Sequence, residues 1–503
     1  MAKRKKKNAF TLILLLVVLA ALCGVYFWYS GKKKENEQQE DTAAIDLLEI
    51  DTDSISSMHY VREDADIILI KQGDEWVSKN EPDRPINQDN VKAMLNAIKS
   101  IKAEKIVAEN PDNLDDYGLM KPEALIEVTL NDGSVVSLKI GIEIIHSMGY
   151  YGMINDDKNV YQLPRATGLP FRYNNTDMTK VEETPDVDSS KITYINISNK
   201  NGNDIELKYQ GDKFYNISGN TLSNWKILKP YGEAYVADAA AIQGIQTNYS
   251  YFSFLSCVDY KCEELGKYGL DDPLATIHVE YTVTRTEKLE KPELDEETQK
   301  LVSEKSYEEP AEYTLYIGKQ NDDGNYYVRL EGSKAVHTMN QSTVDNMLNV
   351  NAFSLLDKYV LLPNIQDVDY IEAEANGKVY KMEIKRRSET DDNGKEKTVA
   401  SYYFNGEEVE EKPFKTLYQV MITSQYDAEI KDKVDLNGAK PVLSLSFHLF
   451  GDGEGTYSAK FYPYNDSFNV IERPDGFMAF ADKRRIDAII ESITTFTGKT
   501  AEQ

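Results

Sequence analysis

Little in the sequence is typical of an enzyme active site or a cofactor site. Cysteine occurs three times and histidine five times in 503 residues. Neither a His-Glu-x-x-His motif nor a Cys-x-x-Cys pair is present, which excludes two common zinc-ligand patterns. There is also no Gly-x-Ser-x-Gly turn and no glycine-rich loop ending in Lys-Ser or Lys-Thr, as a hydrolase nucleophile or a phosphate loop would require. The sequence therefore designates no catalytic, cofactor-binding or metal-binding residue and predicts no cofactor.

The few candidate ligands are scattered. Histidines stand at five separate places, several of them alternating with apolar residues along predicted strands: His59, His146, His278, His337 and His448. A single strand histidine is far more often packed or exposed than catalytic. Two groups of aspartates offer oxygen ligands for calcium without the spacing of a calcium loop, so we expect turns there: Asp112 with Asp115 and Asp116, and Asp322 with Asp323.

Two of the cysteines, Cys257 and Cys262, are five positions apart. On one strand an odd separation directs two side chains to opposite faces. We therefore favour buried or free thiols over a disulfide, and the sequence leaves the bridge open.

Basic residues are scarce outside the N-terminus. Eight of the 57 lie in the first 34 residues, which contain no acidic residue, and the rest of the chain has 49 basic against 84 acidic side chains, a net charge of −35. So acidic a body should repel nucleic acid and anionic lipid head groups. We expect a solvated surface, with calcium or a cationic polymer as the alternative partner.

One long apolar run is present. It extends from Phe10 to Tyr29, about the ~20 residues that a membrane-spanning helix requires. The basic residues from Lys3 to Lys7 outnumber those from Lys32 to Lys34, which places the N-terminus in the cytoplasm. A cleaved signal peptide is the alternative, but Leu22 is too bulky for lipoprotein processing and the run ends in an aromatic belt. We predict a basic leader, an uncleaved single-pass anchor in the cell membrane, and a polar tether, with the domains outside: 1–8, 9–30 and 31–44.

A short phrase recurs in the rest of the chain. Tyr117-Gly118-Leu119-x-x-Pro122 is followed by Ile140-Gly141, and Tyr268-Gly269-Leu270-x-x-Pro273 is followed by Ile317-Gly318. Glycine accepts a positive φ and proline favours an extended residue before it, so the phrase predicts a tight turn that leads into a strand. We interpret it as scaffold and not as a ligand loop. In a third copy, residues 435–441 take its place without Tyr-Gly.

These patterns predict an α+β protein of three tandem repeats, each an antiparallel sheet with one or two packed helices: 45–180, 181–360 and a degenerate 361–503. In the first repeat we expect a helix capped by Asn87 with Val91, Met94, Leu95, Ile98 and Ile101 on one face, and strands at 55–61, 67–71, 75–78, 125–140 as a hairpin, 150–154 and 159–163. In the second we expect a helix near 237–247 and strands at 192–198, 205–209 and 254–258. In the third we expect helices at 414–424 and 483–496 and strands at 368–374, 379–385, 402–404, 442–449, 457–461, 468–471 and 477–480.

The second repeat contains 26 additional residues within the acidic stretch 286–312. They fall where the first repeat has an Asp-Gly turn, and a hairpin loop accommodates such growth at small cost. We interpret the insertion as a passive extension, with a partner-contacting arm as the alternative.

Tyrosine is abundant, with 33 residues against 16 phenylalanines. Three pairs should each direct one ring inward and the next outward on a strand: Tyr150-Tyr151, Tyr326-Tyr327 and Tyr402-Tyr403. Outward rings suit sugar stacking or protein docking, and cross-strand pairing explains them equally well.

Together, the basic leader, the single span, the Trp76 strand, the phrase with Ile140-Gly141, and Tyr150-Tyr151 resemble the bacterial family catalogued as domain of unknown function 4340. The resemblance is best in the first repeat and extends to the second repeat with its insertion. In the third repeat only the positions of the elements match. It implies an envelope protein, often encoded beside a transporter of the ATP-binding-cassette (ABC) type related to gliding-motility systems. It supplies no active site.

Our leading hypothesis is a non-enzymatic interaction subunit of a cell-envelope or ABC-transporter-associated assembly, held to the membrane by its N-terminal helix and without nucleic-acid partners. The alternative is a cell-wall polysaccharide binding module that uses exposed tyrosines such as Tyr326 and Tyr327. A hydrolase comes third, because it requires two acidic residues facing one cleft and the sequence spacing does not reveal them.

Overall fold

The computed structural model describes residues 44–145, 149–202, 204–294, 301–390 and 396–499. The chain divides into two compact units, Met1–Val181 and Glu182–Gln503. The predicted leader and anchor, and the predicted tether up to residue 43, lie outside the described residues. Within the described ranges, no helix combines the length and the apolar character needed to cross a membrane.

Module 1, residues 45–181, lies in the first unit. Its elements in chain order are β1 Ile45–Glu49, β2 Ile55–Arg62, β3 Ala65–Gln72, β4 Glu75–Ser78, α2 Gln88–Lys99, β5 Ser100–Ala103, β6 Lys105–Ala108, the 3-10 helix η2 Asp115–Tyr117, β7 Ala124–Leu130, β8 Val135–Ile144, β9 Gly149–Ile154, β10 Val160–Pro164, α3 Arg165–Gly168 and η3 Leu169–Arg172.

Modules 2 and 3 share the second unit. Module 2, residues 182–360, contains η4 Ser189–Lys191, β11 Ile192–Asn199, β12 Ile205–Tyr209, β13 Trp225–Lys229, α4 Ala239–Ser250, β14 Ser256–Asp259, η5 Leu265–Tyr268, β15 Ala275–Leu294, β16 Leu301–Gln320, β17 Tyr326–Leu330, β18 Val336–Met339, α5 Gln341–Leu348 and α6 Ala352–Leu355. Module 3, residues 361–499, contains β19 Val368–Ala375, β20 Lys378–Thr390, β21 Glu396–Phe404, β22 Glu407–Val409, α7 Glu411–Met421, β23 Ala428–Glu429, β24 Leu443–Leu449, η6 Gly451–Gly453, β25 Gly455–Pro463, β26 Phe468–Glu472, β27 Met478–Asp482 and α8 Lys483–Thr494.

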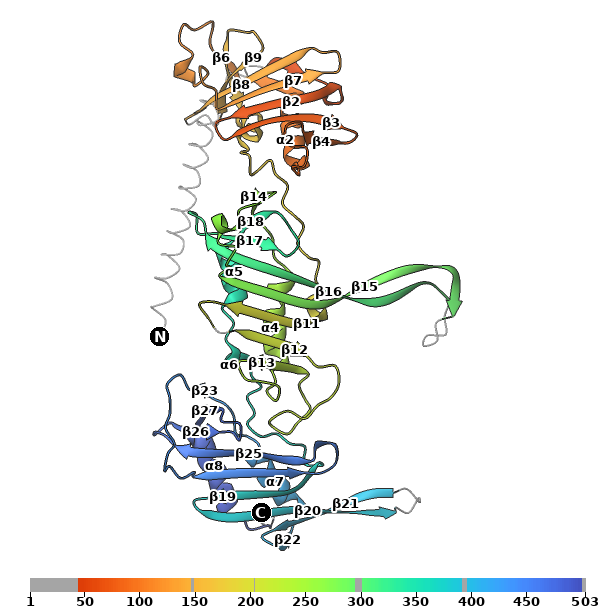
Figure 1. Ribbon diagram of the computed structural model, residues 1–503, viewed down its shortest axis with the longest axis vertical. Helices are drawn as coiled ribbons and strands as arrows, with labels where there is room; N and C mark the ends of the chain where they lie inside the picture. Colours follow the sequence, from red (N-terminus) through yellow and green to blue (C-terminus); the bar gives the residue numbers. More distant parts are fainter. Residues whose placement is uncertain (1–43, 146–148, 203, 295–300, 391–395, 500–503) are drawn as a thin grey trace, which may run out of the picture. The chain divides into compact units, whose positions relative to one another are not determined.

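One strand order occurs three times (Figure 1). The large sheets run β4-β3-β2-β7-β8-β9-β10-β6, β13-β12-β11-β15-β16-β17-β18-β14 and β22-β21-β20-β19-β24-β25-β26-β27-β23, and β1 pairs with β5 in a small fourth sheet. In each module a helix connects the strand at one edge to the strand at the opposite edge. The protein is therefore mostly β, with repeated domain-like units, and the third copy is complete and carries β22 as an additional edge strand.

The helices form where apolar side chains recur at helical spacing behind a polar cap. In α2 the side chain of Asn87 accepts a hydrogen bond from the backbone N–H of Asn90, and Val91, Met94 and Ile98 are buried against the sheet. The predicted helix is thus confirmed, except that Ile101 belongs to β5, where the chain becomes extended and pairs with β1.

The predicted strands all have counterparts, although β20 ends five residues later and β21 begins six residues earlier than predicted. No strand was predicted from the sequence at β6, β13, β18, β22, β23 or the β1–β5 pair. These segments have two to five residues, too few for a clear alternation of apolar and polar side chains.

The repeated phrase docks on the sheet, as predicted for a scaffold element, but on the face opposite the helix. In module 2 it forms a small cluster separate from the main core: Tyr268, Leu270 and Val336. The turn passes through Gly269 with a φ of 68°. A Cβ on Gly318 would overlap the carbonyl oxygen of Tyr268 and lie 3.1 Å from the Cγ of Leu270. Glycine at position 318 therefore allows the turn to reach the strand.

Module 1 repeats this arrangement. Gly118 has a φ of 65°, and a Cβ on Gly141 would overlap the carbonyl oxygen of Tyr117 and lie 3.1 Å from the Cγ of Leu119. The phrase tyrosine packs edge-on against Tyr151 at 5.1 Å between ring centroids. The Ile-Gly pair seen in the sequence is thus the part of the strand against which the turn packs.

Module 3 lacks the phrase for a steric reason. Leu443 pairs with Phe461 as Ala275 pairs with Ile317, so the residue at the glycine position is Tyr462. Tyr462 is buried and its hydroxyl donates to Glu472 at 2.9 Å. A tyrosine side chain there occupies the space that the turn needs, and residues 435–440 are mostly exposed.

The insertion of module 2 is not the hairpin loop that we expected. β15 and β16 are 20 residues each, and they pair from Ala275 with Ile317 to Leu294 with Leu301, with one irregularity beyond Lys288. The threonine-rich and valine-containing stretch 282–286 favours strand, so the hairpin strands continue instead of opening into a loop. Figure 1 shows the two strands projecting beyond their neighbours. We call residues 283–294 and 301–309 the arm.

Modules 2 and 3 are joined by buried contacts. Arg473 is 2% exposed and donates to the carbonyl oxygens of Val360, at 2.9 Å, and Ile217. The rings of Tyr235 and Phe477 pack 5.0 Å apart. This junction positions part of module 3 beside a cavity of module 2.

Candidate functional site

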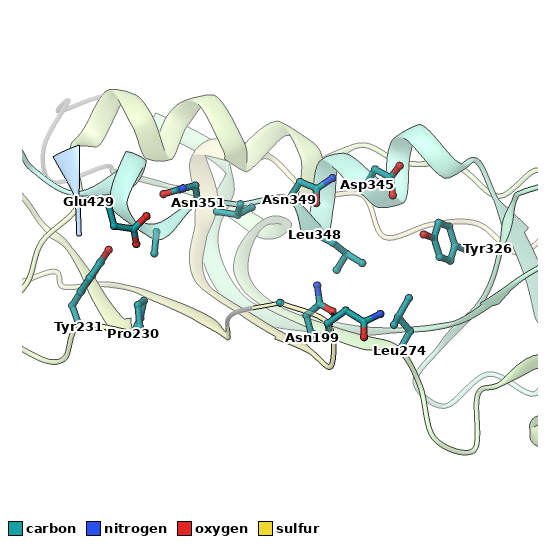
Figure 2. Close-up of a pocket in the computed structure, with 14 residues that line it drawn as sticks. Asn199, Pro230, Tyr231, Leu274, Tyr326, Asp345, Leu348, Asn349, Asn351 and Glu429 are labelled. Carbon is teal, nitrogen blue, oxygen red and sulfur yellow. Dashed lines mark hydrogen bonds between the residues drawn. The ribbon is translucent and has the colours of Figure 1, made fainter. Parts of the chain in front are cut away.

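A cavity of about 430 Å³ opens in module 2 (Figure 2). Its lining combines amides, carboxylates and two tyrosines with a few apolar side chains: Asn199, Asn201, Tyr231, Leu274, Tyr326, Asp345, Leu348, Asn349, Asn351 and Glu429. Hydroxyl-rich ligands are bound by such a mixture, because amides and carboxylates exchange hydrogen bonds with hydroxyl groups while an aromatic ring covers an apolar sugar face.

Several of these side chains also form hydrogen bonds that stabilise the local backbone. The side-chain oxygen of Asn199 accepts from the backbone N–H of Asn201 at 3.0 Å, and that of Asn351 accepts from Ser354 at the start of α6, also at 3.0 Å. Burial and the neighbouring carboxylate of Asp345 raise the pKa of Tyr326. The hydroxyl of Tyr326 therefore stays protonated and remains a hydrogen-bond donor at neutral pH.

Acidic side chains from two modules line the cavity. Asp345 lies on α5 of module 2, whereas Glu429 lies on β23 of module 3. Figure 2 shows Asp345 beside Tyr326 at one end and Glu429 beside Tyr231 at the other. A glycosidase needs two carboxylates that flank one bond. Carboxylates at opposite ends suit the holding of a ligand better than the cleavage of one.

Three of the five histidines lie on the helix-free faces of the sheets and pair with carboxylates. His59 pairs with Asp66 and Glu127, His278 with Glu280 and Glu312, and His448 with Glu372. His146 lies outside the described residues. The side chains of these three histidines are partly buried, with exposed fractions of 35%, 26% and 21%.

His337 is different because it is fully buried. Its ring stacks on Phe254 at 4.3 Å, and its Nε2 lies 3.2 Å from the Glu182 carboxylate. Burial lowers the pKa of His337, and the nearby carboxylate opposes that shift without cancelling it. The neutral imidazole is therefore the form that packs in module 2.

The two aspartate groups form turns, as predicted. Asp115 and Asp116 lie in the 3-10 helix that precedes the phrase, and the backbone N–H of Asp115 donates to Asn113 at 3.0 Å. The turn at Asp322 and Asp323 is organised by Asn321, whose side chain accepts from the Asp323 N–H at 3.1 Å. Cys257 and Cys262 form no disulfide, in agreement with the favoured alternative.

The tyrosine pairs are more buried than a sugar platform would require. Tyr150 and Tyr402 belong to the cores, and Tyr327 packs edge-on against Tyr268 of the phrase at 4.9 Å. Of the two tyrosines proposed for sugar stacking, Tyr326 lines the cavity and Tyr327 does not. The sequence could not reveal the cavity, because strands and turns far apart in the chain build it.

Comparison with known proteins identifies a family relationship. A family model described as "Domain of unknown function (DUF4340)" matches residues 76–224 and 225–433, more than half of the chain. No curated protein and no solved structure matches.

Proposed function

The chain belongs to the DUF4340 family, and from that premise we propose that it is a membrane-tethered, outward-facing protein that binds a partner in the cell envelope. The apolar run at 9–30 supplies the anchor, and the modules supply the contact surface. The resemblance described above implies the kind of partner, a subunit of an ABC-type transporter. The role is that of a non-enzymatic interaction subunit.

The observation that carries this proposal is the arm. Beyond Tyr281 the strand β15 pairs with β16 alone within the described residues, and the paired side chains from Thr284 to Lys288 are exposed. A two-stranded ribbon has no core of its own and exposes backbone groups along both edges. An ordered ribbon of this length suits contact with another molecule.

The charge of the arm indicates the chemistry of the partner. The arm and the six residues between its two strands, 283–309 in all, contain nine acidic and five basic side chains. Lys191 at the base of the arm pairs with Glu308 at 2.8 Å, which fastens the ribbon to its module. Tyr307 is 49% exposed and lies opposite Arg285, so it can serve as an aromatic anchor within a charged surface. We therefore expect a partner with a basic face.

The test uses the full-length protein, solubilised in detergent from cells that also produce the subunits of an ABC-type transporter. Glu304→Lys combined with Tyr307→Ser should reduce co-purification at least about tenfold, because the change removes an anchor and reverses a charge at the contact. Glu408→Lys, an equal charge reversal on the exposed edge strand β22, is the matched control and should leave co-purification unchanged. Equal recovery of the subunits with the arm variant would refute the arm as the contact.

A second candidate function, polysaccharide binding, is favoured by the cavity lining alone. Tyr326→Ala should weaken sedimentation with purified cell wall about tenfold, the loss expected for one aromatic contact worth roughly 1 to 1.5 kcal/mol. Tyr251→Ala is the control, because that ring is 86% exposed and does not line the cavity. Tyr327 is a poor choice for this test because its removal would disturb the phrase. Unchanged sedimentation with Tyr326→Ala would exclude the cavity as a glycan site.

A further inference from the structure

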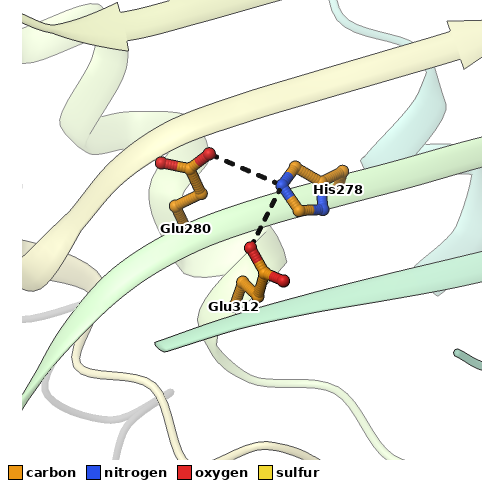
Figure 3. A group of neighbouring side chains, drawn as sticks. All are labelled: His278, Glu280 and Glu312. Carbon is orange, nitrogen blue, oxygen red and sulfur yellow. Dashed lines mark ion pairs between the residues drawn. The ribbon is translucent and has the colours of Figure 1, made fainter. Parts of the chain in front are cut away.

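We propose that the helix-free face of module 2 binds zinc or a similar divalent transition-metal ion through His278, Glu280 and Glu312. Within the described ranges, this is the one group whose three potential ligand atoms all lie within 4.8 Å of one another (Figure 3). The site is separate from the cavity and does not depend on the function proposed above.

The strand register places the three side chains on one face. His278 and Glu280 are two residues apart on β15, so they point in the same direction, and Glu312 on β16 lies directly opposite Glu280. Two carboxylates directly opposite each other in an antiparallel pair repel. A cation bound between them would remove that repulsion.

The imidazole is held with one nitrogen toward both carboxylates. Its Nε2 lies 3.6 Å from Glu280 Oε1 and 3.9 Å from Glu312 Oε2. Its Nδ1 is 3.1 Å from the hydroxyl of Thr314, a residue that is 8% exposed, and the ring of Tyr194 packs edge-on against it at 5.9 Å. A hydrogen bond on the far ring nitrogen is the usual support of a metal-binding histidine.

The spacing and the donor types fit zinc. Zinc bonds of about 2.0 to 2.2 Å in a tetrahedron place neighbouring donor atoms roughly 3.3 Å apart. The ligand atoms lie within 4.8 Å of one another, so the glutamate oxygens have to move by up to about 1.5 Å, which their side chains, 51% and 70% exposed, have room to do. One imidazole nitrogen with two carboxylates suits zinc, whereas calcium prefers oxygen ligands throughout. The open face leaves the fourth position to water.

The other modules show what this site requires. His59 in module 1 also has two carboxylates, but they approach different nitrogens, Asp66 at Nε2 and Glu127 at Nδ1. His448 in module 3 pairs through its Nε2 with one carboxylate among the described residues, that of Glu372 at 3.7 Å, and its ring stacks on Tyr370. Convergence of two carboxylates on one nitrogen is therefore particular to module 2, and the other histidines provide matched controls.

The position also has a mechanical consequence. Glu312 is the last residue of the acidic stretch that contains the insertion. Two residue pairs further along β15 and β16 toward the arm, Thr282 lies opposite Pro310. A bound ion would link β15 to β16 at the base of the arm and resist their separation.

The experiment uses the full-length protein in detergent micelles, treated with a chelator that is then removed. Zinc chloride is titrated into wild type, His278→Ala, Glu312→Gln, His59→Ala and His448→Ala by calorimetry, with cobalt absorption as a second probe of tetrahedral binding. We expect about one strong site in wild type, its loss in His278→Ala, at least tenfold weaker binding in Glu312→Gln, and retention in the other two variants.

Zinc should also raise the urea midpoint reported by Trp225 in module 2, without moving that reported by Trp76 in module 1, because a ligand stabilises the part of the protein that binds it. Fluorescence of Trp225 shows in addition whether His278→Ala is folded. The proposal is overturned if wild type binds zinc no more tightly than His278→Ala, if His59→Ala removes the site, or if calcium binds in place of zinc.

Discussion

Replacing Gly318 by alanine tests the central packing feature of the repeated phrase. The added Cβ would overlap the backbone carbonyl of Tyr268 and approach Leu270 within 3.1 Å, so either the turn or the strand has to move. A backbone obstacle cannot rotate away as the end of a flexible side chain can. The small cluster on the helix-free face, in which Tyr268 and Leu270 are each 4% exposed, would then lose its packing.

The magnitude follows from these two routes. If the turn lifts away, at least the Leu270 side chain becomes exposed, at a cost of about 1.5 to 3 kcal/mol. If the strand yields instead, overpacking costs about 1 to 3 kcal/mol. We expect a loss of about 1 to 3 kcal/mol in the free energy of unfolding of module 2. At an m-value of about 2 kcal/mol/M, this lowers the urea midpoint by about 0.5 to 1.5 M.

The assay follows urea unfolding of the full-length protein in micelles by the fluorescence of Trp225, with Trp28 and Trp76 replaced by phenylalanine. Gly244→Ala is the matched control, since this glycine lies inside α4 with no atom within 4 Å of its added Cβ. Alanine there should raise stability by about 0.5 to 1 kcal/mol through helix propensity. An unchanged midpoint for Gly318→Ala, or a rise similar to that of the control, would refute the role assigned to the Ile-Gly pair.

Two further outcomes are expected from buried polar groups. Burial holds the pKa of His337 below its ordinary value of 6.5, so protonation favours the unfolded state. The contribution of His337 to the stability of module 2 should therefore be complete above about pH 6.5 and be lost as the pH decreases below that value. His337→Gln should reduce this pH dependence in the Trp225 signal. Tyr60→Phe removes a hydroxyl whose one proton is shared between the carbonyl oxygens of Phe171 and Tyr173, at 2.9 and 2.6 Å from the hydroxyl oxygen, and should cost about 1 to 2 kcal/mol in the Trp76 signal. A loss below about 0.3 kcal/mol would contradict the role of this shared hydrogen bond.

The stronger sequence signals were those that depend on local physics. The helix after Asn87 was predictable because a cap and an apolar stripe both lie within a dozen residues. The recurring phrase indicated a turn because Gly269 must adopt a positive φ. The arm was misjudged as a loop because acidic composition suggests exposure but does not distinguish a ribbon from a coil.

The sequence by itself determined most of the longer strands and helices, the repetition of one unit and the position of its turns, since each depends on residues close together in the chain. The tertiary structure alone decided that Gly318 receives the turn of Tyr268, that Tyr462 excludes it from module 3, and that Glu312 meets His278. These relations depend on strand register, and a shift of one residue would direct each side chain to the opposite face of its sheet.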